Sequence, residues 1–143
     1  MFKKILVATD GSPLSAKAAD AAIAYARESG ADLLALSVAV LYPLPPEAGA
    51  YTDVAAFQDA ARAEAQQFLE PIAAAAAREH VKCDLVVRYA ARPWEEIIAV
   101  AEEQGCDCIW MGSHGRTGAD RFLLGSETQK VLAHTTIPVM VYR

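Results

Sequence analysis

Residues 108–132 read CIWMGSHGRTGADRFLLGSETQKVL, and this stretch indicates the fold more directly than any other part of the chain. An apolar run of strand length, from Cys108 to Met111, leads through a glycine-rich segment into a helical pattern that begins near Ser126. A strand, a glycine-rich connection and a helix in this order are the first half of a β-α-β crossover. The stretch therefore predicts a parallel strand followed by a helix that packs on one face of the sheet.

The same alternation extends along the whole chain. Strand-length apolar runs are expected at residues 5–8, 33–40, around 85–87, 108–111 and 138–142. Helical patterns separate them, with starts after Ser12, within the segment that carries Phe57, at Pro93 and near Ser126. The sum is β-α-β-α-β-α-β-α-β, which predicts a single-domain α/β fold with a doubly wound, five-stranded parallel sheet and helices on both faces.

Local signals refine this prediction. The first two strands are continuously apolar, as expected when helices cover both faces of a sheet. Ser12 can cap the first helix, Pro13 can occupy its first position and Gly30 can end it. Pro71 falls inside the second helical pattern and predicts a kink or a helix restart. Residues 41–52 contain three prolines and a glycine and are expected to form a loop.

Composition limits the classes of function. A chain of 143 residues with a formal charge of -5 and a pI near 5.1 fits one acidic domain and argues against nucleic acid as the main partner. No apolar run approaches the roughly 18 residues of a membrane span, and the first residues lack the pattern of a cleavable signal. We expect a cytoplasmic protein whose three cysteines are reduced core thiols, with no direct membrane insertion.

The glycine-rich segment between residues 111 and 126 has the features of an anion site. Glycines remove the Cβ atoms that block close approach, and a helix start offers unpaired N–H groups and a partial positive charge. The sequence contains neither a P-loop motif nor a G-x-G-x-x-G after the first strand, so the alternatives are phosphate binding and plain turn chemistry. Ser126 and Gln129 also fit a capping box, in which they would satisfy the helix's own amides.

Three further side chains each have more than one possible role. His114 is either a base, a metal ligand or an ordinary loop residue, and no ligand partner lies near it in sequence. Arg116 can close over phosphate oxygens or remain a solvated loop charge. Asp10, which follows the first strand, can contact a ribose, hold Mg²⁺ with a bound nucleotide, or only cap the first helix.

Four segments of the chain resemble the universal stress protein (UspA-like) family. They are KILVATDGS at 4–12, MGSHG at 111–115, GS at 125–126 and IPVMV at 137–141, in the order and at the separations of that family. The spaced glycine-serine motif is similar to that of the family's ATP-binding branch. This resemblance implies an adenine nucleotide alpha hydrolase-like sheet with strand order 3-2-1-4-5, in which the first and fourth strands are neighbours.

The resemblance also implies a ligand and a partner. The ligand is ATP, or AMP or ADP, with Mg²⁺, and the partner is a second copy that pairs through the strand from Pro138 to Tyr142; an unknown protein partner is also expected. The residues implied in nucleotide binding lie along adenine and ribose (Ala8, Thr9, Asp10 and, by its backbone, Val38) and around ribose and phosphates (Met111, Gly112, Ser113, His114, Gly115, Arg116, Gly125, Ser126, Glu127 and Thr128).

Glu127 departs from the family pattern, because relatives usually carry a small or apolar residue there. An acid in the first helical turn suits the helix dipole but would repel a triphosphate, which can weaken ATP, favour AMP or ADP, or demand a divalent cation. The leading hypothesis is a dimeric nucleotide-binding regulator in stress or metabolic adaptation. The alternatives are a slow ATPase or phosphotransferase, which lacks an evident general base, and a nucleotide-free dimeric adaptor or chaperone.

Overall fold

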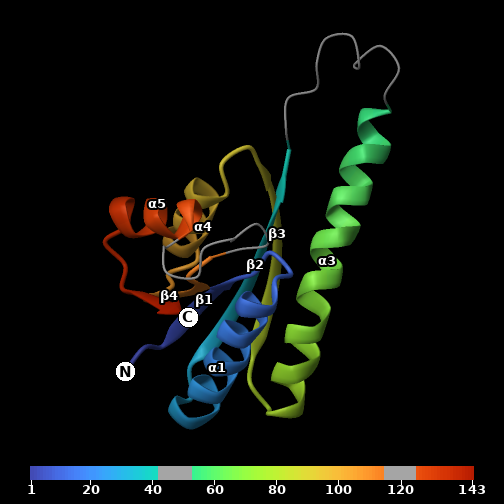
Figure 1. The fold of residues 1–143 in the computed structure, drawn as a ribbon. Coiled ribbons are helices and arrows are strands. Elements are labelled where there is room, and N and C mark those ends of the chain that lie inside the picture. The colour runs from blue at the N-terminus through green and yellow to red at the C-terminus, as the bar shows by residue number, and fades with distance from the viewer. Residues whose placement is uncertain (42–52, 115–124) are drawn as a thin grey trace.

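A five-stranded parallel sheet separates two layers of helices in the computed structural model, which describes residues 1–41, 53–114 and 125–143 (Figure 1). The strands lie in the order β3-β2-β1-β4-β5, so the order implied by the family resemblance is confirmed. In chain order the elements are β1 (Lys4–Ala8), α1 (Pro13–Ser29), β2 (Asp32–Val40), α3 (Val54–Arg78), β3 (Cys83–Ala90), α4 (Pro93–Glu103), β4 (Cys108–Gly112), α5 (Ser126–His134) and β5 (Val139–Tyr142).

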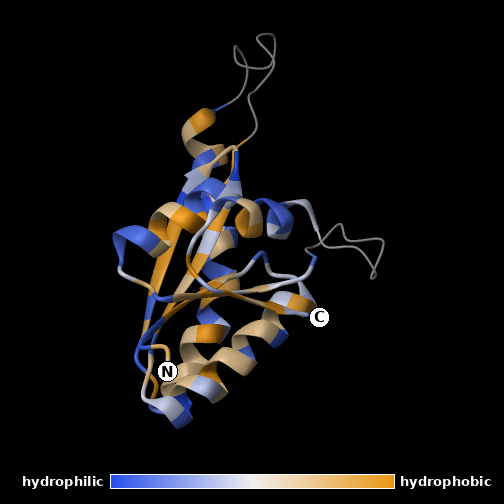
Figure 2. Ribbon diagram, turned by 90° about the vertical axis from the view of Figure 1, so that its left-hand side faces the viewer, coloured by the Kyte–Doolittle hydropathy of each residue, from blue (hydrophilic) through white to orange (hydrophobic). Residues whose placement is uncertain are grey.

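The two faces of the sheet carry two separate apolar cores. Ile5 and Val7 point to the side covered by α1 and α3, where they meet Leu69 of α3. Leu6, between them in sequence, joins Val100 of α4 on the opposite side. Because successive strand residues face opposite sides, burial on both faces requires the continuous apolar runs seen in β1 and β2. Figure 2 shows these strands in the hydrophobic colour.

Most element boundaries follow the local signals. The Ser12 hydroxyl accepts a hydrogen bond from the Ser15 N–H at 3.2 Å, and Gly30 ends α1 with φ +76°, so both predicted caps are confirmed. The last strand begins at Val139 rather than at Pro138. The Pro138 carbonyl accepts from the Ile109 N–H at 2.9 Å, but proline has no N–H to continue the ladder.

Helix α3 runs without interruption from Val54 to Arg78, so of the kink or restart expected at Pro71, the restart is wrong. Pro71 is exposed, and water can reach the carbonyl one turn earlier that loses its N–H partner. The helix is held on both sides of the proline by the buried Leu69 and Ala76. Tertiary burial therefore overrides the local cost of the proline.

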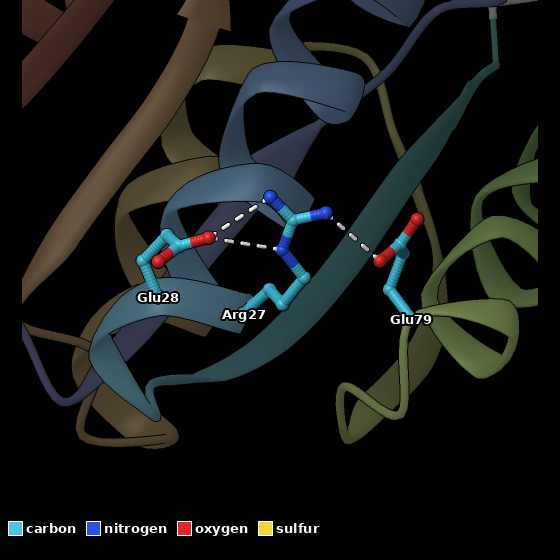
Figure 3. Close-up of polar contacts among 3 residues, drawn as sticks. All are labelled: Arg27, Glu28 and Glu79. Carbon is cyan, nitrogen blue, oxygen red and sulfur yellow. Dashed lines mark hydrogen bonds and ion pairs between the residues drawn. The ribbon is translucent and has the colours of Figure 1, made fainter.

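An exposed ion-pair cluster joins the C-terminal ends of α1 and α3 (Figure 3). The Arg27 guanidinium donates to Glu79 at 3.1 Å and to Glu28 at 2.9 Å. Hydrogen bonds to Glu79 and then to Glu28 raise the pKa of Arg27 above its ordinary value. The three side chains are well exposed, so solvent screening limits their contribution to stability.

The three cysteines carry free thiols; Cys106 and Cys108 are buried in the core as expected, whereas Cys83 is only partly buried. Burial is the main cause that raises the pKa of each thiol above its ordinary value. A raised pKa lowers the thiolate fraction and hence the reactivity of the group. Within the described ranges, no helix combines the length and the apolar character required to cross a bilayer.

The Asp107 carboxylate fixes the start of β1. It accepts hydrogen bonds from the backbone N–H groups of Lys3 and Lys4 at distances of 2.9 to 3.2 Å. Burial alone would raise the pKa of this carboxyl, but the backbone donors outweigh it and hold the pKa below its ordinary value. The folded chain therefore stabilises the charged form of Asp107 more than the unfolded chain does.

Asp107→Ala is expected to lower the free energy of unfolding near neutral pH by about 1–2 kcal/mol, because backbone donors lose their acceptor. The lowered folded pKa makes this contribution complete above the ordinary carboxyl range and removes it as pH falls through the folded value. Urea unfolding of both proteins across the acid range should show their difference shrinking at low pH. Asp59→Ala, at an exposed position of α3, is the control. A difference that stays constant with pH would contradict the prediction.

Candidate functional site

A cavity of about 810 Å³ lies across the C-terminal ends of β2, β1 and β4. It collects most residues of the predicted nucleotide site, although these are spread over four separate segments of the sequence. Those that line it are Ala8, Thr9, Asp10, Val38, Met111, Gly112, His114, Gly125, Ser126, Glu127 and Thr128. Ser113 is not among the lining residues, and the predicted Gly115 and Arg116 lie outside the described residues.

The topology explains why the cavity forms at this edge of the sheet. The chain leaves β1 towards α1 on one face, and it leaves β4 towards α5 on the other face (Figure 1). β1 and β4 are neighbours, so their outgoing connections separate and leave a crevice between them. Such a reversal of strand order is the usual ligand position in open α/β sheets.

The connection from β1 to α1 is held by its own polar side chains. Asp10 Oδ1 accepts from the Ser12 N–H at 2.9 Å, and the Thr9 hydroxyl lies 3.0 Å from that of Ser15. The helix cap is Ser12, so Asp10 shapes the turn before the helix instead of capping it. The positions of Thr9 and Asp10 at the cavity wall are thus fixed locally.

The described ends of the segment between β4 and α5 are held together by backbone contacts of Ser113. The Ser113 carbonyl accepts from the Gly125 N–H at 2.6 Å, and the Ser113 N–H donates to the Tyr142 carbonyl at 2.7 Å. The Ser113 hydroxyl is 3.1 Å from Nδ1 of His114. Ser113 is 3% exposed, so it ties β5, the end of β4 and the start of α5 together from behind the cavity.

The start of α5 differs from the predicted capping box. The N-cap is Gly125, which has no side chain to cap the helix, and Ser126 is the first helical residue and is exposed. The Thr128 hydroxyl donates to the Gly112 carbonyl at 2.8 Å, and this residue is 2% exposed. Thr128 therefore anchors the helix start with its side chain, and within the described residues the N-cap provides no side-chain acceptor for the first-turn N–H groups.

Glu127 makes a contact that its position in sequence does not indicate. Its Oε2 accepts from the Trp94 N–H at 2.8 Å, at the start of α4, where the N-cap residue Arg92 makes no side-chain cap. The Trp94 and His134 rings also pack together, with centroids 4.4 Å apart. Glu127 is thus a cap supplied by a second helix, and it helps to hold α4 and α5 side by side.

The electrostatics of the cavity are acidic as far as the structure describes its wall. The ionisable lining residues in that part are the carboxyl groups of Asp10, Glu64 and Glu127, and the imidazole of His114. No lysine or arginine is present among them. Attraction for an anion in this part of the cavity must therefore come from backbone N–H groups and the N-terminal end of α5.

Sequence reasoning missed the parts of the cavity wall that come from helices on the two faces of the sheet. Helix α3 contributes Ala61, Glu64, Ala65 and Phe68, and α4 contributes Pro93 and Ile97. These residues carry no motif, and the helical periodicity that marks Ala65 and Phe68 as apolar does not say what they face. Among the described residues, no group of histidine, cysteine and carboxylate side chains is placed to hold a metal ion.

A family model, curated relatives and solved structures all match this chain to the same family. The model of the universal stress protein family matches residues 1–143. Universal stress protein YxiE of Bacillus subtilis is 35% identical over 150 residues, which span 100% of both chains. The structure of MJ0577 from Methanocaldococcus jannaschii has 30% identity and a TM-score of 0.82, covering 99% of this chain and 96% of that one.

Two more distant structures contain ligands. A universal stress protein from Archaeoglobus fulgidus in complex with dAMP has 22% identity and a TM-score of 0.71, covering 99% of this chain and 98% of that one. A universal stress protein in complex with cAMP has 22% identity and a TM-score of 0.65, covering 99% and 97%. At this identity, both indicate a shared fold.

Proposed function

Because this chain belongs to the universal stress protein family, we propose that it binds an adenine nucleotide in the cavity at the C-terminal ends of β2, β1 and β4. The observation that carries the proposal is the start of α5, which borders the cavity and whose N-cap, Gly125, provides no side-chain acceptor for the first-turn N–H groups. The cavity volume of about 810 Å³ suits a small-molecule ligand. The dAMP and cAMP complexes of two relatives point to the same ligand class.

The strand order sets the direction in which the ligand would lie. The phosphates would sit at the N-terminal end of α5, beside Gly125 and Ser126 after β4. The ribose would then lie over the end of β1, near Thr9 and Asp10, and the adenine over the end of β2, near Val38. The neighbours β4, β1 and β2 thus correspond to phosphate, ribose and base.

The acidic lining favours a charge-compensated ligand. Carboxylates of Asp10, Glu64 and Glu127 line the same cavity as the proposed phosphate site. ATP would therefore bind with Mg²⁺ on its phosphates, which reduces its net negative charge. AMP, which carries less charge, would depend less on the cation.

The edge strand β5 would pair with the same strand of a second copy of the chain. β5 is the last strand in the sheet order, and the side chain of Met140 on it is 44% exposed. An apolar edge strand can pair with a strand of another chain, and two-fold symmetry limits such an assembly to a homodimer. The resulting protein would be a regulatory nucleotide binder in stress or metabolic adaptation, acting in the cytoplasm.

Native mass spectrometry of freshly purified protein tests both parts of this proposal. We expect a mass of two chains that carries adenine nucleotide, which ATP, AMP or ADP added to stripped protein should restore. Isothermal titration with and without Mg²⁺ then measures the affinity and its dependence on the cation. Protein that neither retains nor rebinds any adenine nucleotide would refute the proposed ligand, and a monomer at all concentrations would refute the proposed assembly.

Glu127→Gln is expected to bind ATP roughly 2–10-fold more tightly than the wild type in the absence of divalent cation, because one negative charge near the phosphates is removed. The amide oxygen of glutamine can still accept from the Trp94 N–H. AMP affinity should change less, because AMP carries fewer charges. Titrations with both nucleotides, at low and high salt, measure these differences.

Glu127→Val, compared with Glu127→Gln, distinguishes the effect of the charge of Glu127 from the effect of its hydrogen bond to the start of α4. It also removes the charge but leaves the Trp94 N–H without its acceptor, so we expect a loss of stability of about 1 kcal/mol in addition to tighter ATP binding. Equal or weaker ATP binding by both variants would show that the charge of Glu127 does not oppose the triphosphate.

A further inference from the structure

A second, smaller cavity adjoins the proposed nucleotide site. Its volume is about 290 Å³, and it lies between α1 and α3 on one face of the sheet. Thr9 and Phe68 line both cavities. Its remaining lining residues are Gly11, Ser12, Ala16, Asp20, Gln67, Pro71 and Ile72. The two spaces are therefore neighbours that share one aromatic side chain.

The Phe68 ring packs directly on the backbone after β1. A Cβ atom at Gly11 would lie 2.4 Å from Cε1 of Phe68, closer than any side chain tolerates. Gly11 also has φ +79°, a conformation that favours glycine. The absence of a side chain at Gly11 thus makes room for the ring, which forms an aromatic wall that the two cavities share.

The wall stands at the nucleoside end of the proposed ligand. Phe68 belongs to α3, on the face covered by α1 and α3, whereas α5 lies with α4 on the opposite face (Figure 1). With phosphates at the start of α5, the ribose over the end of β1 would face Thr9 and Phe68. The smaller cavity, which shares Thr9 and Phe68 with the larger one, would then lie next to the ribose.

We propose that Phe68 determines ligand specificity by closing the smaller cavity to the ribose side of the nucleotide. The inference rests on the proposed function and adds a limit on the size of the substituents that the site accepts on the ribose. A space of about 290 Å³ is just below the range of complete ligand pockets, which begins near 300 Å³, but it has room for one bulky substituent. The intact ring admits adenine nucleotides with free ribose hydroxyls and excludes those with a large group attached to them.

The test compares two ligands on three proteins. The ligands are ATP and ATP that carries an N-methylanthraniloyl ester on the ribose hydroxyls, each with Mg²⁺. The proteins are the wild type, Phe68→Ala and Phe57→Ala. Phe57 lies on the same helix, is 46% exposed and lines neither cavity, so it is a matched control for the change of phenylalanine to alanine.

For the wild type, we expect the Kd of the ester to be at least roughly 10-fold higher than the Kd of ATP. Phe68→Ala should lower this ratio of the two Kd values by about 10-fold, because a steric clash is removed. Phe57→Ala should keep the wild-type ratio. Phe68→Leu, which preserves apolar packing with a smaller side chain, should shift the ratio in the same direction and decides the matter if the alanine variant does not fold.

Two failures are distinguishable. If the wild type binds ATP and both Phe68 variants keep its ratio, or if the wild type already binds the ester as well as ATP, the role of Phe68 is overturned while the proposed function stands. If the wild type binds neither nucleotide, the proposed function falls and the specificity of Phe68 falls with it.

Discussion

Gly125→Val is expected to weaken adenine-nucleotide binding by at least roughly 100-fold, the loss of about two charge-assisted hydrogen bonds at about 1.5 kcal/mol each. A Cβ atom at Gly125 would lie 3.1 Å from the His114 Cα and 3.3 Å from the Ser113 carbonyl oxygen. Both contacts are tight and involve backbone, and the Gly125 N–H is held to the same carbonyl at 2.6 Å. The backbone on one side of this contact must therefore give by a few tenths of an ångström. We expect the start of α5 to move, which displaces the N–H groups proposed to bind phosphate.

Isothermal titration with ATP and Mg²⁺ measures the loss, and circular dichroism shows whether the variant is folded. Gly105→Val is the control, because Gly105 has φ +67° and lines neither cavity. Valine is strained there, so this variant should lose stability and still bind the nucleotide. Unchanged affinity in a folded Gly125→Val protein would contradict the role assigned to the start of α5.

Leu69→Ala is expected to lower the free energy of unfolding by about 2–5 kcal/mol, the range for truncating a buried leucine. Leu69 is 1% exposed and joins α3 to the core that contains Ile5 and Val7. All the buried residues of α3 lie at or after Ala65, so the second half of the helix anchors it to the sheet. Urea unfolding at equilibrium measures the change.

The first half of α3 provides the comparison. Phe57→Ala removes a larger side chain from the same helix, but Phe57 is 46% exposed. Its effect should remain within about 0.5 kcal/mol, as is usual for exposed positions. Similar losses from the two variants would show that the whole length of α3, rather than its second half, supports the fold.

The strand and helix pattern could be predicted because the signals that specify it are local. The apolar runs around Leu6 and Leu34 are continuous because both faces of the sheet are buried, and Ser12 and Gly30 bound α1 by their own chemistry. The strand order did not follow from these signals. It was implied by the resemblance of four short segments to a known family, and the structure confirms it.

Predictions failed where a contact between distant residues competed with a local preference. Ser126 and Gln129 fit a capping box with Ser126 as the N-cap, but α5 begins one residue earlier than this box requires, at Ser126, with Gly125 as its N-cap. The proline rule suggested a kink or a restart at Pro71, and no restart occurs because buried residues on both sides hold α3 to the sheet. In each case tertiary packing outweighed a preference of about 1–3 kcal/mol.

The sequence by itself determined the alternation of strands and helices, the burial of both sheet faces and the glycine-rich connection before α5. Each of these depends on neighbours within one or two turns, where periodicity and capping act. Only the tertiary structure decided that Glu127 caps α4, that Phe68 lies against Gly11, and that α3 forms a wall of the cavity. These contacts join residues 33 to 57 positions apart, and they exist only once the sheet has brought the helices together.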